Sequence, residues 1–134
     1  MSNRVGLGTV VETPTARVHL NGDGVVVVRV RDGAVQSLAD AKANIAAARS
    51  ATAGTRRPLM VDIRRAQPLD AAVRHQYSGP TFGEGFLALA ILVESSPFGR
   101  MMGNIYLRVA HTGIPTQLFV DETRAMKWLI GYRR

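Results

Sequence analysis

The stretch FLALAILVESSPFGRMMGNIYLRVA, residues 86–110, predicts a buried strand, a sharp turn and a helix. Residues 86–93 are apolar throughout and lack the alternation of a half-exposed strand, so we expect a strand covered on both faces. Ser96 is suited to cap the helix, and Pro97 fits its first turn, where no backbone donor is missed. Apolar residues then follow at helical spacing: Phe98, Met101, Met102, Ile105 and Val109.

Three strands are predicted in the N-terminal part of the chain, at residues 5–12, 16–20 and 25–31. The turn Asn21-Gly22-Asp23-Gly24 predicts a hairpin between the second and third, because Asn and Gly tolerate the positive φ of tight turns. The first strand could lie at a sheet edge and pair with a second copy of the chain, which would give a homodimer.

Strands and helices alternate along the rest of the chain. A helix is expected over residues 37–53, with Ser37 and Asp40 spaced as in a capping box. The further elements are a strand at 58–63, a helix over 70–77, the unit at 86–110, a strand at 116–120 and a helix capped by Asp121. This order predicts a single α/β domain with a mixed, mostly parallel sheet, an N-terminal antiparallel hairpin and about four helices.

Composition narrows the functional class. The chain has 134 residues, enough for one domain with its own core, and no cysteine, which removes disulfides, thiol nucleophiles and thiolate metal sites. Neither a signal peptide nor an apolar run near the roughly 20 residues of a membrane helix is visible, so we expect a cytoplasmic protein without membrane insertion.

The net charge of +7 means that nucleic-acid binding has to be considered. Arg56-Arg57 precede the strand at 58–63 and Arg64-Arg65 follow it, so the two pairs are expected at opposite ends of that strand. Aromatic residues are few, which leaves no evident stacking platform for single strands. We therefore expect only non-specific nucleic-acid binding.

Residues 59–73, LMVDIRRAQPLDAAV, resemble the core of the STAS domain, the sulphate-transporter and anti-sigma-factor-antagonist fold. In that family an apolar strand ending in Asp leads to a helix start of the Asp-Ser-x-Gly type, which residues 59–62 and Leu69-Asp70 match in part. Other motifs resemble uncharacterised bacterial STAS-like proteins: Ser96-Pro97, Gly103-Asn104, the segment 115–119 and the segment 125–129.

The resemblance implies a single STAS-like domain over residues 1–134 and a non-enzymatic regulatory or protein-interaction function with a protein partner and no cofactor. The switch position is degenerate, however. Where the antagonists carry a phosphorylated Ser after the Asp, here Asp70, this chain has Ala71, and Val73 stands in place of the expected Gly. Alanine has no hydroxyl, so it cannot accept phosphate.

A first group of candidate ligand-binding residues, Ser95, Ser96 and Arg100, lies where the strand at 86–93 passes into the next helix. Backbone donors and the helix dipole favour an anion there, and α/β sheets often bind ligands at that edge. No glycine-rich phosphate motif accompanies these residues, so simple capping by Ser96 is the plainer interpretation.

A second group, Arg74 and Tyr77, lies on one predicted helix and could face a cleft, with Arg74 binding an anion and Tyr77 donating a hydrogen bond. The i, i+4 spacing of Val73 and Tyr77 instead favours a core-facing pair on an otherwise solvated helix.

No pattern indicates catalysis or a metal site. His19, His75 and His111 lack metal-ligand spacing, and Asp62 and Asp70 have no accompanying nucleophile. We expect Met101, Met102 and Trp128 to fill the core. Three functions stay open: a protein-interaction module, a binder of small anionic or lipid-like ligands, and a non-specific nucleic-acid-associated protein. An apolar cavity lined by Phe98 and Met101 would favour the second, and a contiguous Arg face the third.

Overall fold

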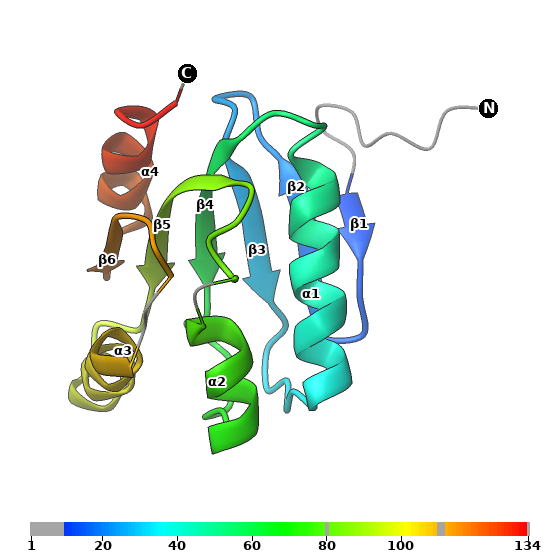
Figure 1. Ribbon diagram of the computed structural model, residues 1–134. Coiled ribbons are helices and arrows are strands. Elements are labelled where there is room, and N and C mark those ends of the chain that lie inside the picture. Colours follow the sequence, from blue (N-terminus) through cyan, green and yellow to red (C-terminus); the bar gives the residue numbers. More distant parts are fainter. Residues whose placement is uncertain (1–9, 80, 110–111, 134) are drawn as a thin grey trace.

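The computed structural model describes residues 10–79, 81–109 and 112–133, and these form a six-stranded sheet with four helices (Figure 1). The elements in chain order are β1 Val10–Glu12, β2 Ala16–Leu20, β3 Val26–Val30, α1 Leu38–Ala51, β4 Arg57–Asp62, α2 Ala71–Ser78, β5 Phe86–Leu92, α3 Pro97–Val109, β6 Thr116–Phe119 and α4 Glu122–Ile130. The predicted order of elements is confirmed. The part of the first predicted strand at residues 5–9 lies outside the described residues.

The strands lie in the order in which they occur along the chain, β1 to β6. The β1–β2 and β2–β3 pairs are antiparallel, and β3 to β6 are parallel. The mixed sheet and the N-terminal antiparallel hairpin are therefore as predicted.

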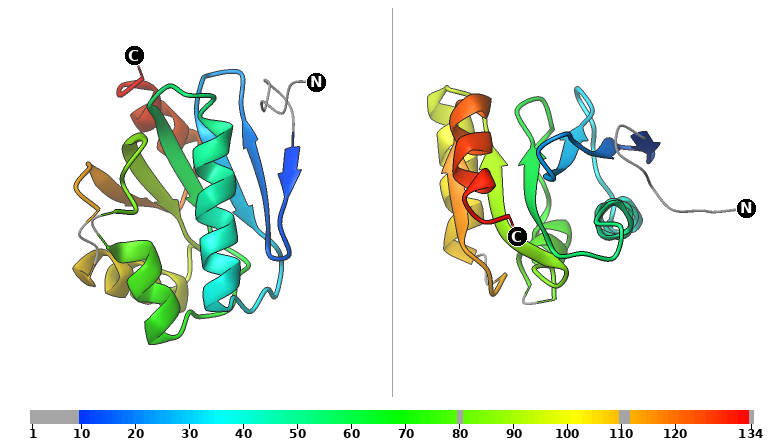
Figure 2. Two further views of the ribbon diagram at one scale, coloured as in Figure 1. Left: turned by 45° about the vertical axis from the view of Figure 1, so that its right-hand side comes forward. Right: turned by 90° about the horizontal axis from the view of Figure 1, so that it is seen from above.

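Helices cover both faces of the sheet. One core layer joins α1 to residues such as Val26 and Val28, and a second joins α4 to Val25 and Val27, because successive side chains of a strand point to opposite faces. Figure 2 shows α1 and α4 separated by the strands. Every residue of β5 is buried, which confirms the strand covered on both faces.

Capping side chains fix where the helices begin. Ser37 and Asp40 form the capping box at α1, and the carboxylates of Asp70 and Asp121 accept main-chain N–H bonds at the first turns of α2 and α4. These short-range signals are why the sequence locates the helix starts so closely.

Two of the side chains expected in the core, Met101 and Trp128, are placed differently, and Phe98 is exposed beside Met101. Phe98 and Met101 are 57% and 50% exposed, because no described element covers that side of the first turns of α3. Trp128 is half-buried rather than largely buried: it packs between Phe119 and Tyr132, whereas its helix directs Ala125 and Leu129 into the core. Met102 is partly buried.

Candidate functional site

A cleft of about 110 Å³ opens at the carboxyl edge of the sheet, between the loop after β4 and the turn after β5. We call it the carboxyl-edge cleft. Its lining comes from four segments and includes Gln36, Arg64, Leu69, Arg74, Ser96 and Phe98. Parallel α/β sheets commonly bind ligands at this edge, because the loops that follow the strands converge there.

The turn after β5 forms one wall of this cleft. The Ser96 hydroxyl accepts a hydrogen bond from the Gly99 main-chain N–H at 3.0 Å, so Ser96 caps α3 as the plainer interpretation expected. A Cβ on Gly99 would lie 2.6 Å from the Glu94 carbonyl oxygen, which no side chain tolerates. Glycine therefore allows α3 to begin directly against the end of β5.

The opposite wall comes from the β4–α2 loop and the first turns of α2. The Arg74 guanidinium donates to the Leu69 carbonyl at 2.9 Å, which holds it beside the cleft. Asp70 accepts the Val73 main-chain N–H at 3.0 Å. Ala71 is the exposed first residue of α2, so the switch position of the STAS family falls at a helix N-terminus but carries no hydroxyl.

Behind the cleft, a smaller cavity of about 50 Å³ lies between the sheet and helices α1 and α2. It shares Gln36, Ile63 and Leu69 with the cleft, so the two spaces adjoin. We call it the inner cavity. Its other walls are apolar apart from Asn44 and Tyr77.

The polar side chains at the inner cavity bond to one another. The Asn44 amide donates to the Thr15 hydroxyl at 2.9 Å and to the Tyr77 hydroxyl at 3.1 Å, and the Tyr77 hydroxyl donates to Gln36. Burial raises the pKa of Tyr77 to about 12. The bond between Asn44 on α1 and Tyr77 on α2 holds these two helices together. No buried side-chain polar atom in the described residues lacks a hydrogen-bond partner.

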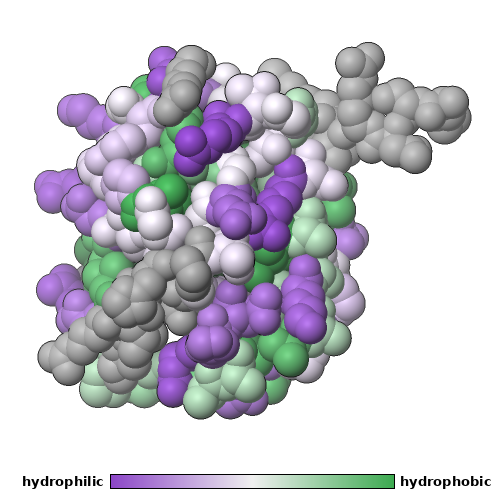
Figure 3. Space-filling view, in the orientation of Figure 1, coloured by the Kyte–Doolittle hydropathy of each residue, from purple (hydrophilic) through white to green (hydrophobic). Residues whose placement is uncertain are grey.

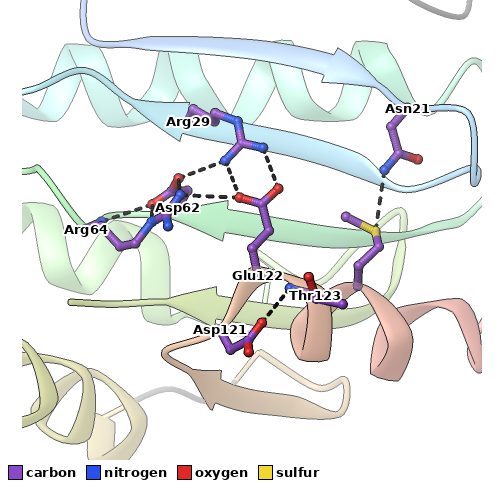
Figure 4. Close-up of polar contacts among 8 residues, drawn as sticks. Asn21, Arg29, Asp62, Arg64, Asp121, Glu122 and Thr123 are labelled. Carbon is purple, nitrogen blue, oxygen red and sulfur yellow. Dashed lines mark hydrogen bonds and ion pairs between the residues drawn. The ribbon is translucent and has the colours of Figure 1, made fainter. Parts of the chain in front are cut away.

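A second polar cluster joins the carboxyl edge to α4 (Figure 4). Arg29 donates to Asp62 at 2.8 Å and to Glu122 through two bonds of 2.8 Å. Arg64 donates to Asp62 at 2.8 Å and reaches Glu122 at 3.3 Å. We call these four residues the α4 anchor, because they bind the first turn of α4 to β3 and β4.

The α4 anchor is electrically balanced, with two guanidiniums and two carboxylates. Burial alone would raise the pKa of Asp62, but hydrogen bonds from Arg64 and Arg29 outweigh it and lower that pKa. The hydrogen bond from Arg29 lowers the pKa of Glu122. Both carboxylates are therefore held ionised, which suits a structural ion cluster better than acid–base chemistry.

The structure brings together only part of the predicted ligand group. Ser96 and Arg74 line the carboxyl-edge cleft, and Tyr77 lines the inner cavity. Ser95 and Arg100 are exposed and lie outside both linings.

Sequence reasoning missed Arg64 and Gln36 as lining residues. Arg64 follows a buried strand by two residues, and that position at the carboxyl edge was the available signal. Gln36 lies just before α1 and carried no signal of its own.

Metal binding finds no support in residues 10–79, 81–109 and 112–133, where no three His, Asp or Glu side chains gather as ligands. His111 lies outside these ranges. No helix in the same part of the chain has the length and apolar character to cross a bilayer.

The architecture defines an α/β protein with the fold called SpoIIAA-like, which is STAS-like. An uncharacterised DUF3478-family protein from Shewanella loihica PV-4 with this fold matches over 90% of both chains, at 15% identity and a TM-score of 0.54. A protein of unknown function from Arthrobacter sp. FB24 matches 89% of this chain and 95% of its own, at 25% identity and a TM-score of 0.33.

The chain belongs to the family described as Domain of unknown function (DUF7793), whose model matches residues 18–133. No curated protein matches it. The first structural likeness confirms the predicted fold.

Proposed function

We propose that this protein is a non-enzymatic, STAS-like interaction module that binds a protein partner at the carboxyl edge of the sheet. The observation that carries this proposal is where the large exposed hydrophobic residues lie. The described residues expose six, and all but Val10 follow the carboxyl end of a parallel strand: Val35, Leu38, Phe98, Met101 and Val120.

The surroundings of these residues suit a protein interface. Phe98 lines the carboxyl-edge cleft together with Arg64 and Arg74. Aromatic, Met and Arg side chains are enriched in the cores of protein interfaces. In Figure 3 apolar surface adjoins hydrophilic side chains along the lower edge, where the parallel strands end. A partner with an apolar anchor would complement this edge.

Site-specific photo-crosslinking tests the proposal. A photoreactive residue is placed at position 98 or 38, with position 10 as the control, because Val10 is similarly exposed but lies on the edge strand β1. Crosslinks to a common protein are expected from positions 98 and 38 only. Phe98→Asp should then abolish co-purification of that protein and Val10→Asp should not. Equal crosslinking at all three positions would reject the proposal.

A second candidate, binding of a small anionic or lipid-like ligand, is favoured by the adjoining cleft and inner cavity. Arg74 lies at the cleft, whereas the walls of the inner cavity are mainly apolar. We expected an apolar cavity lined by Phe98 and Met101 to favour this function. The lining of the cleft includes Phe98 and Met102 but not Met101, so that expectation is met in part. A ligand with an anionic head and a short apolar tail would suit both spaces.

Nuclear magnetic resonance titration with hexanoate separates this candidate from protein binding. Saturating shifts of the Gln36 and Arg74 amide signals would support ligand binding. Arg74→Gln should suppress these shifts, whereas the exposed-site variant Arg124→Gln should not. An unchanged spectrum up to about 10 mM hexanoate would reject ligand binding. Half-saturation at that concentration corresponds to a binding free energy near about −2.7 kcal/mol.

Nucleic-acid binding stays a prediction of weak, salt-sensitive attraction. Arg56 and Arg57 lie at the beginning of β4, whereas Arg64 and Arg65 follow its end, so the described Arg pairs do not form one face. Binding in a mobility-shift titration should weaken steeply with salt. Sequence-selective, sub-micromolar binding at physiological salt would contradict this.

A further inference from the structure

A hollow of about 260 Å³ lies at the amino edge of the sheet, at the opposite end of the strands from the carboxyl-edge cleft. Arg56 and Arg57 at the start of β4 and Arg133 after α4 line it, together with the hairpin turn at residues 22–24. Figure 1 shows this turn, the segment leading into β4 and the end of α4 together at the top of the molecule.

Each of the three guanidiniums is oriented by one hydrogen bond to a main-chain carbonyl. Arg56 donates to Phe86 at 2.8 Å, Arg57 donates to Thr52 at 2.9 Å, and Arg133 donates to Asp23 at 3.2 Å. A guanidinium has five N–H donors, so one such bond positions the group and leaves further donors for a ligand.

The charges in this hollow are not balanced. The residues that line it include three Arg and one acidic residue, Asp23, which leaves two formal positive charges. Within the described residues none of the three Arg side chains forms an ion pair, in contrast to Arg29 and Arg64 in the α4 anchor. The excess charge is therefore held in place by main-chain bonds and is available to an anion.

Backbone geometry brings the hairpin turn close to this charge. Gly24 has a φ of +80°, and a Cβ there would lie 3.3 Å from the Arg57 guanidinium nitrogen Nη1. Glycine at this position keeps the turn narrow and the approach to Arg57 open.

We propose that this hollow is a binding site for a phosphate group. A phosphate monoester carries nearly two negative charges at neutral pH, which matches the excess charge of the lining. Guanidiniums bind phosphate oxygens through paired, charge-assisted hydrogen bonds, and the oxygens of one phosphate can accept from more than one Arg. The site is distinct from the carboxyl-edge cleft and does not depend on the function proposed there.

The opposing explanation is that these Arg side chains only stabilise the fold. Arg57 bonds to Thr52, the C-cap residue of α1, where a cation is favourable whether or not a ligand binds. That role alone predicts no phosphate binding, and the two explanations therefore differ in a direct measurement.

The test uses the full chain at physiological salt and two probes, glycerol 3-phosphate in solution and vesicles that contain phosphatidic acid. We expect wild-type protein to bind at least one probe, and Arg133→Gln to weaken that binding about tenfold, as expected for loss of a charge-assisted pair. Arg57→Gln should do the same. Arg57 also caps α1, so Arg57→Gln could fail to fold. The test then depends on Arg133→Gln, because Arg133 is exposed.

Arg124→Gln is the matched control, because it removes the same charge from the other end of α4 and should change the affinity less than twofold. Binding of glycerol 3-phosphate that depends on Arg133 identifies a small phosphorylated molecule as the source. Binding that depends on Arg133 but occurs only with vesicles identifies a lipid headgroup. Binding of neither probe, or equal weakening by Arg124→Gln and Arg133→Gln, overturns the proposal.

Discussion

Arginine has opposite surroundings at the two edges of the sheet. At the carboxyl edge, Asp62 and Glu122 neutralise Arg29 and Arg64 within hydrogen-bonding distance. At the amino edge, Arg56, Arg57 and Arg133 bond only to main-chain carbonyls in the structure described. The difference shows that net charge says little about function until the partner of each charge is known. Neutralised guanidiniums hold elements together, whereas unneutralised ones can meet a ligand.

The two edges are linked by α4, which carries Glu122 at its start and is followed by Arg133. Leu129→Ala should therefore disturb both edges and give the largest loss, about 2–5 kcal/mol, because Leu129 is fully buried. Trp128→Ala should cost less than the roughly 3–5 kcal/mol of a fully buried Trp, because its ring is half-buried.

Urea unfolding followed by circular dichroism measures both variants and avoids relying on Trp128 as the probe. A Trp128→Ala variant less stable than Leu129→Ala would contradict this placement of the α4 core residues.

Removing a carboxylate should matter at one edge only. Asp62→Asn is expected to cost about 1–3 kcal/mol, because Asp62 is buried and its loss leaves Arg29 and Arg64 less well neutralised. Asp23→Asn at the amino edge should stay within about 0.5 kcal/mol. Thermal and urea unfolding of the pair would show this contrast, and equal losses would remove the distinction between the two edges.

Acid should likewise weaken the carboxyl edge selectively. The pKa values of Asp62 and Glu122 are lowered in the folded state, so the unfolded chain binds more protons as the pH falls. The stabilisation is complete above the ordinary carboxyl pKa of about 4 and is lost as the pH falls through the lowered values.

Stability measured between about pH 5 and pH 2 should therefore decline less steeply in Arg29→Gln than in wild type. The variant has lost the main hydrogen bond that lowers the pKa of Glu122 and one of the hydrogen bonds that lower the pKa of Asp62, where Arg64 remains. Arg56→Gln, the control at the amino edge, should keep the wild-type slope. An unchanged slope in Arg29→Gln would show that other carboxylates dominate acid unfolding.

The smallest effect is expected at Arg100, which lies near the carboxyl edge but outside the α4 anchor. Arg100→Ala should change stability by no more than about 0.5 kcal/mol, because the side chain is exposed. A loss comparable to that of Asp62→Asn in the same unfolding assay would mean that Arg100 has a structural partner.

The sequence alone determined the elements and their order, because their signals are local. The hairpin at residues 21–24, the Ser37–Asp40 capping box and the fully apolar strand β5 depend on neighbouring residues, and all three are present. The STAS-like resemblance then led to the correct fold. Short-range chemistry was sufficient because backbone conformation is chosen mainly within a few residues.

The tertiary structure decided which distant groups meet and which faces stay uncovered. Arg29 and Glu122 are 93 residues apart in the chain, and no local pattern links them. The same holds for Arg57 and Arg133 at the amino edge. Helical spacing placed Ala125 and Leu129 of α4 on one face, which is buried, but such spacing cannot say whether another element covers a given face. Phe98 is exposed and Trp128 half-buried for that reason: burial depends on packing between elements, which local periodicity does not contain.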